Sequence, residues 1–310
     1  MSVHNGAKHV GKSIESIIGQ TFCEAEIIVV DDGSLDNTAE VLRYYAAEDR
    51  RIRIVHHSNQ GLTRSLNTGC ALATADLIAR QDSGDKSLPG RLKLQVDYLE
   101  QHPDVVAVGC GVRWIGPEGE YLGQWVRNQS PQETTRDLIE NGIGFVHPSV
   151  MFRRDAYEKA GGYRSQFRFA QDHDLWYRMA EQGLLATCPE VLFEYRMDVA
   201  GISPQNRTRQ QRLAQLAREC FLARQRGESE AALLEEANRV SWDTSIEPSI
   251  SPKQGQGAAA YFVGSQLYQQ RDQRCRRYLK MALAARARPI QSALKYATSF
   301  LNCRDKENNR

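Results

Sequence analysis

A run of four apolar residues that ends on two carboxylates constrains the fold of this chain more than any other feature. The run covers residues 27–30, and Asp31, Asp32 and Gly33 follow it directly. Consecutive β-branched residues are typical of a strand buried on both faces, as in parallel sheets. Because ligands of open α/β sheets bind outside the carboxyl ends of the strands, both aspartates are expected at a ligand edge. The alternative is that they only form a turn and cap the helix predicted from Thr38.

Strand patterns alternate with helical patterns through the first hundred residues. Strands are predicted at 1–3 (a short stub), 27–30, 52–55, 77–79 and 105–108, and helical spacing covers 13–18, 38–47, 66–73 and 88–99. This alternation predicts parallel pairing with right-handed crossovers. We therefore expect an α/β fold with a mostly parallel sheet flanked by helices.

The second half of the chain has a different rhythm. Glycines and aromatic residues predict a hairpin or an irregular excursion over 114–125, and apolar segments predict late strands at 150–152 and 191–195 around a helix at 172–181. Beyond residue 203 the pattern is mostly helical, with a loop predicted at 247–257. We predict a domain over 1–204, with halves 1–108 and 109–204, and a helical C-terminal appendage over 205–310.

Charge and cysteine content suggest where the protein works. Residues 205–310 hold 19 Lys and Arg against 10 Asp and Glu, although the net charge of the chain is only +2. Such a basic region predicts either attraction to an anionic membrane surface or a solvated helical face. The seven cysteines are scattered without metal-ligand spacing, which favours a reducing cytoplasm. We expect no nucleic-acid partner.

Residues 6–13 match the phosphate-loop pattern G-x-x-x-x-G-K-[ST]. A P-loop NTPase is therefore an alternative. Only five residues precede Gly6, which is little chain for the strand that positions such a loop. The acidic strand also follows Lys12 after only 19 residues, whereas the magnesium-binding partner strand is expected much further along the chain.

Two more acidic clusters follow apolar segments. Asp82 and Asp85 come after the predicted strand 77–79, so their carboxylates are expected at the same edge as Asp31. Oxygen ligands beside a diphosphate suit Mg²⁺ or Mn²⁺. At 172–174 the sequence is Asp-His-Asp at a helix start, where one carboxylate can cap the helix and the other can act as a general base.

Motifs spread over about residues 1–200 carry a family resemblance. They are the segments 3–6, 13–22, 28–38, 59–62, 67–69, 82–91, 147–154, 161–163, 171–178 and 195–196. In order and approximate spacing they resemble glycosyltransferase family 2. The resemblance implies a GT-A fold and an inverting transfer of a sugar from a nucleotide diphosphate donor, usually a UDP-sugar.

The resemblance also implies roles for individual residues. His4 matches a residue that packs on the base, Asp32 a carboxylate that bonds the uracil ring, and Asp82 the first position of the D-x-D motif. Asp172 matches the catalytic base that deprotonates the acceptor hydroxyl. The predicted nucleotide-binding set is Ser2, His4, Asn5, Asp31, Asp32, Asp82 and Ser83, and the predicted acceptor set is His147, His173 and Asp174.

The expected metal site departs from the family pattern. Gly84 occupies the second D-x-D position, where the family has a metal-ligating aspartate, and a glycine has no side chain to offer. We therefore predict that Mn²⁺ or Mg²⁺ is held by Asp85, Asp82 or Asp198, or mostly by the phosphates. Asp198 is included because it follows Tyr-Arg where relatives often carry a histidine.

Together these features predict an inverting glycosyltransferase that moves a sugar from a UDP-sugar to a glycan or lipid-linked acceptor in cell-surface polysaccharide synthesis. The expected location is the cytoplasm, with peripheral association at the inner face of the membrane through the basic C-terminal region. A non-catalytic sugar-nucleotide-binding or scaffold protein is the alternative from a different class, motivated by Gly84.

Overall fold

The computed structural model describes residues 1–199, 206–243 and 251–303, and these fall into two compact units. Unit 1 comprises residues 1–112, 125–195 and 212–243. Unit 2 comprises residues 113–124, 196–211 and 244–310, apart from those outside the described ranges. The boundary predicted between residues 204 and 205 lies outside the described residues.

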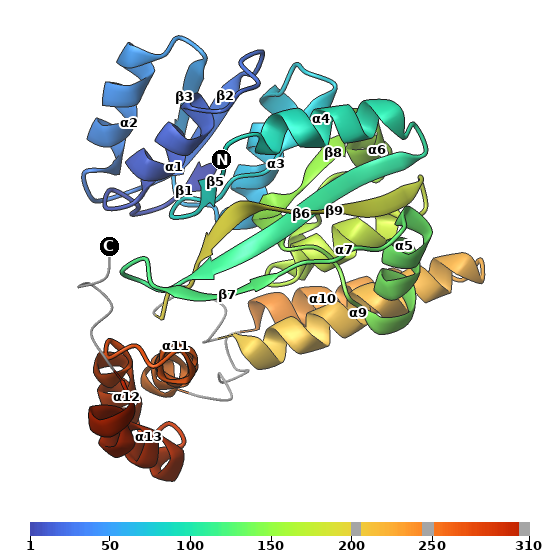
Figure 1. The fold of residues 1–310 in the computed structure, drawn as a ribbon. Helices are drawn as coiled ribbons and strands as arrows, with labels where there is room; N and C mark the ends of the chain where they lie inside the picture. The colour runs from blue at the N-terminus through green and yellow to red at the C-terminus, as the bar shows by residue number, and fades with distance from the viewer. Residues whose placement is uncertain (200–205, 244–250, 304–310) are drawn as a thin grey trace. The chain divides into compact units, whose positions relative to one another are not determined.

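Unit 1 begins with a three-stranded parallel sheet in the order β1–β2–β3 (Figure 1). Its strands are β1 (Ser2–Val3), β2 (Ile27–Asp32) and β3 (Ile52–His57). All six residues of β2 are buried, as the apolar run predicted, and the strand continues through both aspartates. Helices α1 (Val10–Ile18) and α2 (Thr38–Glu48) contribute apolar side chains to the core beside this sheet.

A second sheet follows the order β4–β8–β6–β9–β5, with β7 paired to β6. Its strands are β4 (Leu77–Ala79), β5 (Lys86–Ser87), β6 (Val105–Ile115), β7 (Tyr121–Trp125), β8 (Met151–Arg153) and β9 (Leu184–Arg196). The pairs β4–β8, β6–β8 and β5–β9 are antiparallel. A parallel bridge between Ser2 and Asp82 links β1 to the segment that follows β4.

Helices flank both sheets, which confirms the predicted α/β class (Figure 1). In unit 1 they also include α3 (Leu62–Leu72), α4 (Arg91–Gln101), α5 (Pro131–Asn141), α6 (Arg154–Lys159), α7 (Gln171–Met179), most of α9 (Arg207–Gln225) and α10 (Ala231–Trp242). The main core joins α7 to α9: Trp176 and Leu175 belong to the same buried cluster as Leu216 and Phe221.

Unit 2 contains α11 (Pro252–Gln269), α12 (Cys275–Ala284) and α13 (Pro289–Asn302) beside the hairpin segment 113–124. The Tyr278 hydroxyl donates a 2.7 Å hydrogen bond to Glu120, which ties α12 to that segment. The loop predicted at 247–257 is wrong from residue 252 onward, because Ser251 and Gln254 form a capping box and α11 begins there. In the described part of the chain, we find no helix long and apolar enough to cross a membrane.

Candidate functional site

The carboxyl ends of β1, β2 and β4 bring the first two acidic clusters to one edge of unit 1. Ser2 pairs with Val30 of β2 on one side and forms the bridge to Asp82 on the other. The loop after β1 packs tightly there, because a Cβ added to Gly6 would lie 2.8 Å from the Ser83 hydroxyl oxygen. The predicted nucleotide-binding residues of β1, β2 and the loop after β4 therefore lie together.

The carboxylate of Asp32 is buried and holds the loop that follows β3. Its two oxygens accept the backbone N–H groups of Gln60 (2.7 Å) and Gly61 (2.9 Å). The His57 ring nitrogen Nδ1 lies 3.3 Å from the same carboxylate. Because a carboxylate has about four acceptor positions, Asp32 retains capacity for a donor group of a ligand.

Asp31 is equally buried and shapes the turn after β2. Its carboxylate accepts the Ser34 N–H (3.1 Å) and lies 3.0 Å from His56 Nδ1. Asn5 adopts a positive φ of 51° and accepts the Leu35 N–H at 2.7 Å, so its side chain also fixes this turn. These contacts bind the loops after β1 and β2 to each other.

The His4 ring is exposed at this edge and held by its neighbours. Its Nδ1 lies 2.8 Å from the Asp32 carbonyl oxygen, and its Nε2 lies 3.2 Å from the Asn59 amide nitrogen. An exposed ring fixed at its rim by hydrogen bonds offers a flat face on which another ring can stack. Asn59 was not among the predicted site residues.

Helix α1 is tied to the second acidic loop by side-chain hydrogen bonds. The Ser13 hydroxyl accepts the Gly84 N–H (2.9 Å), and the Ser16 hydroxyl accepts the Ser87 N–H (3.1 Å). Ser13 is fully buried inside a helix that already begins at Val10. In a P-loop this hydroxyl would bind Mg²⁺, whereas here the Ser13 hydroxyl is bonded to the Gly84 N–H of the second acidic loop. The P-loop interpretation of residues 6–13 is therefore wrong.

Arg80 is a site residue that the sequence analysis missed. The side chain is only 3% exposed; its guanidinium donates to Asp82 Oδ1 at 2.7 Å and to His147 Nε2 at 3.3 Å. Burial is the largest single influence and opposes the charge, but Asp82, Tyr163 and Cys70 together outweigh burial and raise the pKa of Arg80. Asp82, about a third exposed at 32%, therefore sits at the edge with a fixed cation behind it.

His147 receives a second hydrogen bond on the same ring nitrogen. The Tyr163 hydroxyl lies 2.8 Å from His147 Nε2, so two donors converge on one acceptor. Burial, and then the charge of Arg80, lower the pKa of His147 to about 4. The ring is therefore neutral at physiological pH, with its proton on Nδ1. Asn67 of α3 fixes Tyr163 by accepting its N–H (3.0 Å) and donating to its carbonyl (2.8 Å).

Asp172 lies in the first turn of α7, close enough to His147 for its charge to act on that ring. Burial raises the pKa of Asp172, but the nearby His173 and His147 rings and the hydrogen bond from the His173 N–H (2.9 Å) outweigh burial and lower it. The carboxylate is thus ionised at neutral pH, as a general base requires. His173 is half-buried beside it.

Asp174 does not fit the acceptor role predicted for it. The side chain is 1% exposed and lies between two arginines: Arg164 Nε and Arg178 Nε each lie 3.1 Å from its carboxylate. Arg164 also reaches Glu230 of the segment before α10, at 2.7 Å. Through Arg164, the Asp174 carboxylate links α7 to the segment around residue 164 and to the segment before α10. Because it is buried between the two arginines, an acceptor cannot reach it.

The described residues contain no metal site built from three or more protein side chains, and the predicted ion held by one or two aspartates or by the phosphates stays a prediction. Among residues 1–199, 206–243 and 251–303, no group of three or more His, Cys, Asp or Glu side chains is arranged to hold a metal ion. Gly84 has no ligand, Asp85 is only 4% exposed, and one oxygen of Asp82 is occupied by Arg80. Asp198 belongs to unit 2, so its role as a ligand stays a prediction.

Comparisons with known proteins identify the family. The profile described as "Glycosyl transferase family 2" matches residues 1–161. The O-antigen biosynthesis glycosyltransferase WbnJ of Escherichia coli is 33% identical over 195 residues, which cover 63% of this chain and 73% of WbnJ.

Solved structures confirm the GT-A fold. S. aureus TarS 1-349 in complex with UDP superimposes with a TM-score of 0.55 at 16% identity. The match covers 96% of this chain and 88% of the TarS chain. The mannosyltransferase PcManGT from Pyrobaculum calidifontis, in complex with GDP-Man and Mn²⁺, superimposes with a TM-score of 0.55 at 18% identity. The match covers 99% of this chain and 86% of the PcManGT chain. The chain belongs to glycosyl transferase family 2 and is a glycosyltransferase, rather than a non-catalytic binding module or a P-loop NTPase.

Proposed function

We propose that this enzyme transfers a sugar, with inversion, from a UDP-sugar to a glycan or lipid-linked acceptor in the synthesis of a cell-surface polysaccharide. The observation that carries the proposal is the polar cluster of Asp82, Arg80, His147 and Tyr163 beside Asp172. This cluster connects Asp82, at the predicted donor edge, to Asp172, whose ionised carboxylate is suited to act as a base. The names of WbnJ and of the UDP complex of TarS support the polysaccharide and the donor.

In this proposal the nucleotide binds at the edge formed by β1, β2 and the loop after β4. The His4 ring packs on the base, and the free acceptor capacity of Asp32 meets a ring N–H. Asp82 accepts a ribose hydroxyl through the oxygen that Arg80 leaves free. Ser2, Asn5, Asp31 and Ser83 hold these loops in place.

Asp172 then removes the proton from the acceptor hydroxyl. The oxygen attacks the anomeric carbon from the face opposite the diphosphate, the new C–O bond forms, and the bond to the diphosphate breaks with its electron pair on the leaving group. His147 and His173 line the acceptor side; Asp174 is left out because it is buried between arginines. PcManGT was solved with Mn²⁺, and a divalent ion held by Asp82, Asp85 or Asp198 together with the diphosphate would stabilise the leaving group here.

Substitution of Asp172 tests the proposal. Asp172→Asn keeps the shape of the side chain and removes the base, so we expect UDP affinity within about threefold of wild type and transfer reduced by roughly 10²–10⁴-fold. Asp155→Asn, which alters an exposed aspartate in α6, is the matched control and should keep full transfer. Isothermal titration with UDP and a donor panel with NMR detection of the anomer measure both properties. Wild-type transfer by Asp172→Asn would exclude the assigned base.

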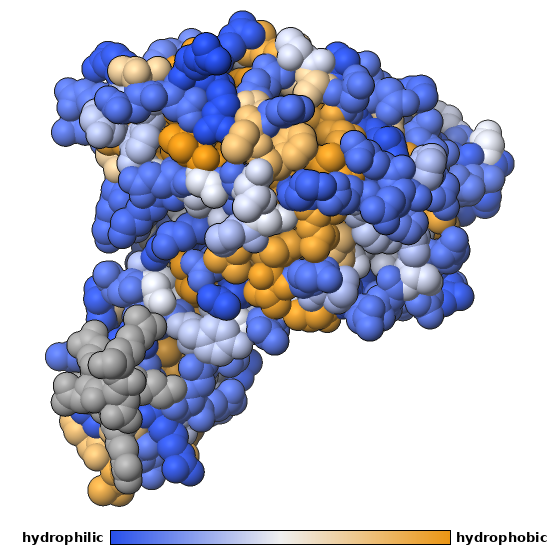
Figure 2. Space-filling view, turned by 45° about the horizontal axis from the view of Figure 1, so that its top comes forward, coloured by the Kyte–Doolittle hydropathy of each residue, from blue (hydrophilic) through white to orange (hydrophobic). Residues whose placement is uncertain are grey.

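Membrane association is proposed through α13 in unit 2. Ile290, Leu294 and Leu301 are 80%, 64% and 88% exposed, and their spacing puts them on one stripe of this helix. Figure 2 shows exposed apolar side chains gathered at one end of unit 2. An apolar stripe in a region with a surplus of basic residues suits the interface of an anionic membrane. All seven cysteines are free, which supports a cytoplasmic site of action at the inner face.

Vesicle sedimentation tests this part separately. The full chain should pellet with vesicles that contain anionic lipid and remain in solution with purely zwitterionic ones. Leu294→Asp should abolish pelleting and leave transfer to a water-soluble acceptor unchanged, because the residue is exposed and lies outside unit 1. Equal pelleting of Leu294→Asp and wild type would contradict the role of this stripe.

A further inference from the structure

An arginine packed against two aromatic rings lies just before the helix that carries Asp172. The guanidinium carbon of Arg168 lies 4.7 Å from the centre of the Trp242 ring and 5.2 Å from the centre of the Phe169 ring. Arg168 is exposed, Phe169 is half-buried, and Trp242 is 46% exposed. These three residues, which all belong to unit 1, are called the aromatic platform.

Hydrogen bonds from the end of α10 fix this platform to the loop that precedes α7. The fully buried Ser241 hydroxyl accepts the Arg168 N–H (3.2 Å) and donates to the Gln166 carbonyl (2.6 Å). The indole N–H of Trp242 donates to the Ser165 carbonyl at 3.3 Å. The polar atom of the indole is therefore satisfied inside the protein, while nearly half of the side chain stays exposed. An aromatic surface that is held rigid before a ligand arrives loses little entropy when the ligand binds.

The platform is close to the proposed base along the chain. Asp172 follows Phe169 by three residues, and three successive Cα–Cα steps span at most about 11 Å. Ala170, the residue before the first turn of α7, lies between them, so Phe169 and Asp172 are at the same end of this helix. If the hydroxyl of one sugar unit meets Asp172, the neighbouring units of the same saccharide are within reach of the platform.

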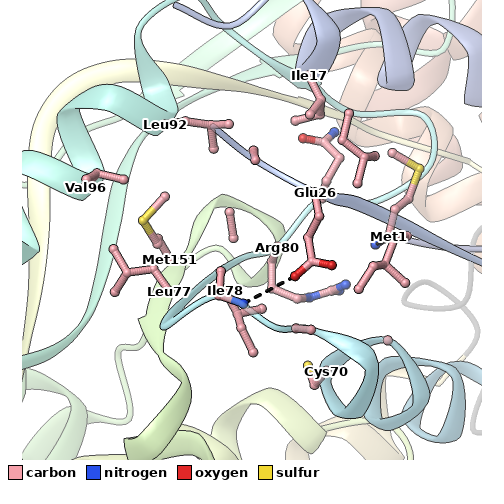
Figure 3. A pocket seen from close by; sticks show the side chains of 18 of the residues that line it. Met1, Ile17, Glu26, Cys70, Leu77, Ile78, Arg80, Leu92, Val96 and Met151 are labelled. Carbon is pink, nitrogen blue, oxygen red and sulfur yellow. Dashed lines mark hydrogen bonds between the residues drawn. The ribbon is translucent and has the colours of Figure 1, made fainter. Parts of the chain in front are cut away.

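A mostly apolar cavity in the same unit offers no such position. It has a volume of about 320 Å³, lies between β2 and β4, and has Leu77, Leu92 and Met151 in its wall (Figure 3). Neither Asp172 nor any residue of the platform lines this cavity. The platform is therefore the surface that can bind a sugar unit next to the reacting one.

The charge of Arg168 indicates the class of saccharide. Arg164 and Arg178 are both paired with Asp174, whereas Arg168 has no ion pair within the part of the chain that the structure describes. Stacking on a ring uses the flat face of a guanidinium and leaves its N–H edge for a planar anion such as a carboxylate. The C–H face of a sugar ring can pack on the exposed indole, because the face of an aromatic ring is apolar and electron-rich.

We propose that the aromatic platform is an acceptor subsite for an acidic sugar unit, which places its carboxylate on Arg168 and its ring against Trp242. This rests on the function proposed above, because it names the class of acceptor that the same enzyme uses. Phe169 supports the guanidinium from its own ring. No bond forms or breaks at the platform; it positions the acceptor so that the hydroxyl of the next unit faces Asp172.

Two oligosaccharides of equal length test the subsite in the full chain with UDP present. The acidic probe is a tetrasaccharide of alternating glucuronic acid and N-acetylglucosamine, and the neutral probe is the N-acetylglucosamine tetramer. Ligand-detected NMR titration measures both affinities. Because a charge-assisted bidentate hydrogen bond is lost with the neutral probe, wild type should bind the acidic one roughly tenfold more tightly. Raising the salt concentration should reduce that preference.

Substitutions in the platform separate the charge from the aromatic surface. Arg168→Gln should abolish the preference for the acidic probe and leave the affinity for the neutral one unchanged. Trp242→Ala should weaken both probes by roughly tenfold, and Trp242→Phe, which keeps an aromatic face, should recover most of the affinity. Tyr44→Ala removes an exposed aromatic side chain of α2 in the same unit and is the matched control, with wild-type affinities expected.

The proposal would be overturned if wild type bound both probes equally, or failed to bind the acidic one. Equal affinity of Trp242→Ala and wild type for the acidic probe would also overturn it. A loss that Trp242→Phe does not recover would assign the effect to the hydrogen bond with Ser165 and contradict a role for the aromatic face. UDP affinity, measured in the same samples, distinguishes the two proposals: normal UDP binding with unresponsive platform variants refutes the subsite alone, whereas loss of UDP binding in wild type refutes the donor site.

Discussion

The two aspartates in the first turn of α7 should respond in opposite ways to the same substitution. Asp174 is 1% exposed and accepts hydrogen bonds from Arg164 and Arg178, which are 16% and 7% exposed. Asp174→Asn removes the negative charge and takes the counter-ion from the nearly buried guanidinium of Arg178, whereas Arg164 keeps its ion pair with Glu230. Breaking a buried ion pair in this way costs about 3–5 kcal/mol. Because asparagine keeps one acceptor oxygen, we expect a loss near 3 kcal/mol, a fall in Tm of roughly 6–12 °C for a chain of this size.

Asp172→Asn should leave the free energy of unfolding within about 1 kcal/mol of wild type, because the bond from the His173 N–H can be kept by the remaining oxygen. Urea unfolding followed by tryptophan fluorescence measures both variants, because one of the four tryptophans, Trp176, is buried in the same helix. The expected pattern is an unstable Asp174→Asn and a stable, inactive Asp172→Asn. A stable Asp174→Asn that binds UDP and fails to transfer would reverse the two assignments.

Three further predictions concern the donor edge and the polar cluster. Asp32→Asn cannot accept both the Gln60 and Gly61 N–H groups, so it should lower stability by about 1–3 kcal/mol and weaken UDP binding in calorimetry. Because the folded pKa of His147 is about 4 against an ordinary 6.5, the unfolded chain takes up the proton first as pH falls. The stability that depends on neutral His147 is complete above pH 6.5 and is lost as the pH falls towards 4. The difference in unfolding free energy between wild type and His147→Gln, measured by urea titration at a series of pH values, should therefore shrink from pH 6.5 to pH 4. Gly84 has a φ of 104°, so Gly84→Asp should cost about 1–3 kcal/mol in thermal unfolding even though it restores a carboxylate.

The parts of the fold that the sequence predicted well are those fixed by short-range pattern. Residues 27–30 were predicted as a buried strand because side chains of a strand alternate between its two faces, so four consecutive β-branched residues require a strand that is covered on both faces. The position of Asp82 at the same edge was predicted from the strand pattern at 77–79, and the parallel bridge between Ser2 and Asp82 places it there. Both inferences needed only the direction of parallel strands.

The polar cluster behind that edge was out of reach of such patterns. Arg80 meets His147 across 67 positions of sequence, and His147 meets Tyr163 across 16. Asp172 and Asp174 look alike in the sequence, but Arg164, ten residues upstream, and Arg178, one helical turn downstream, both pair with Asp174. Signals did exist for Arg80 and Tyr163, since one directly precedes the acidic loop and the other follows a glycine pair.

The start of α11 shows a different failure of local pattern. Its glycines suggested a loop, yet they permit close packing within unit 2. A Cβ on Gly257 would lie 2.4 Å from the Ala285 Cβ, and one on Gly264 would lie 3.0 Å from Leu279 Cγ. Glycine in a helix costs about 1 kcal/mol relative to alanine, and close helix contact offsets that cost. Sequence alone cannot tell this use of glycine from a turn.

The arginine behind the acidic loop changes what that loop can do. A pair of free carboxylates repels a diphosphate and requires a cation to bridge the two. In this chain Gly84 removes one of those carboxylates, and the guanidinium of Arg80, 3% exposed, neutralises Asp82 from the protein side. The charge of a buried guanidinium is only weakly screened by solvent, so the pairing cancels most of the repulsion that Asp82 would exert on an anion at this edge. We therefore infer that Arg80 removes an electrostatic obstacle to a diphosphate and leaves the second oxygen of Asp82 available as an acceptor for hydroxyl groups.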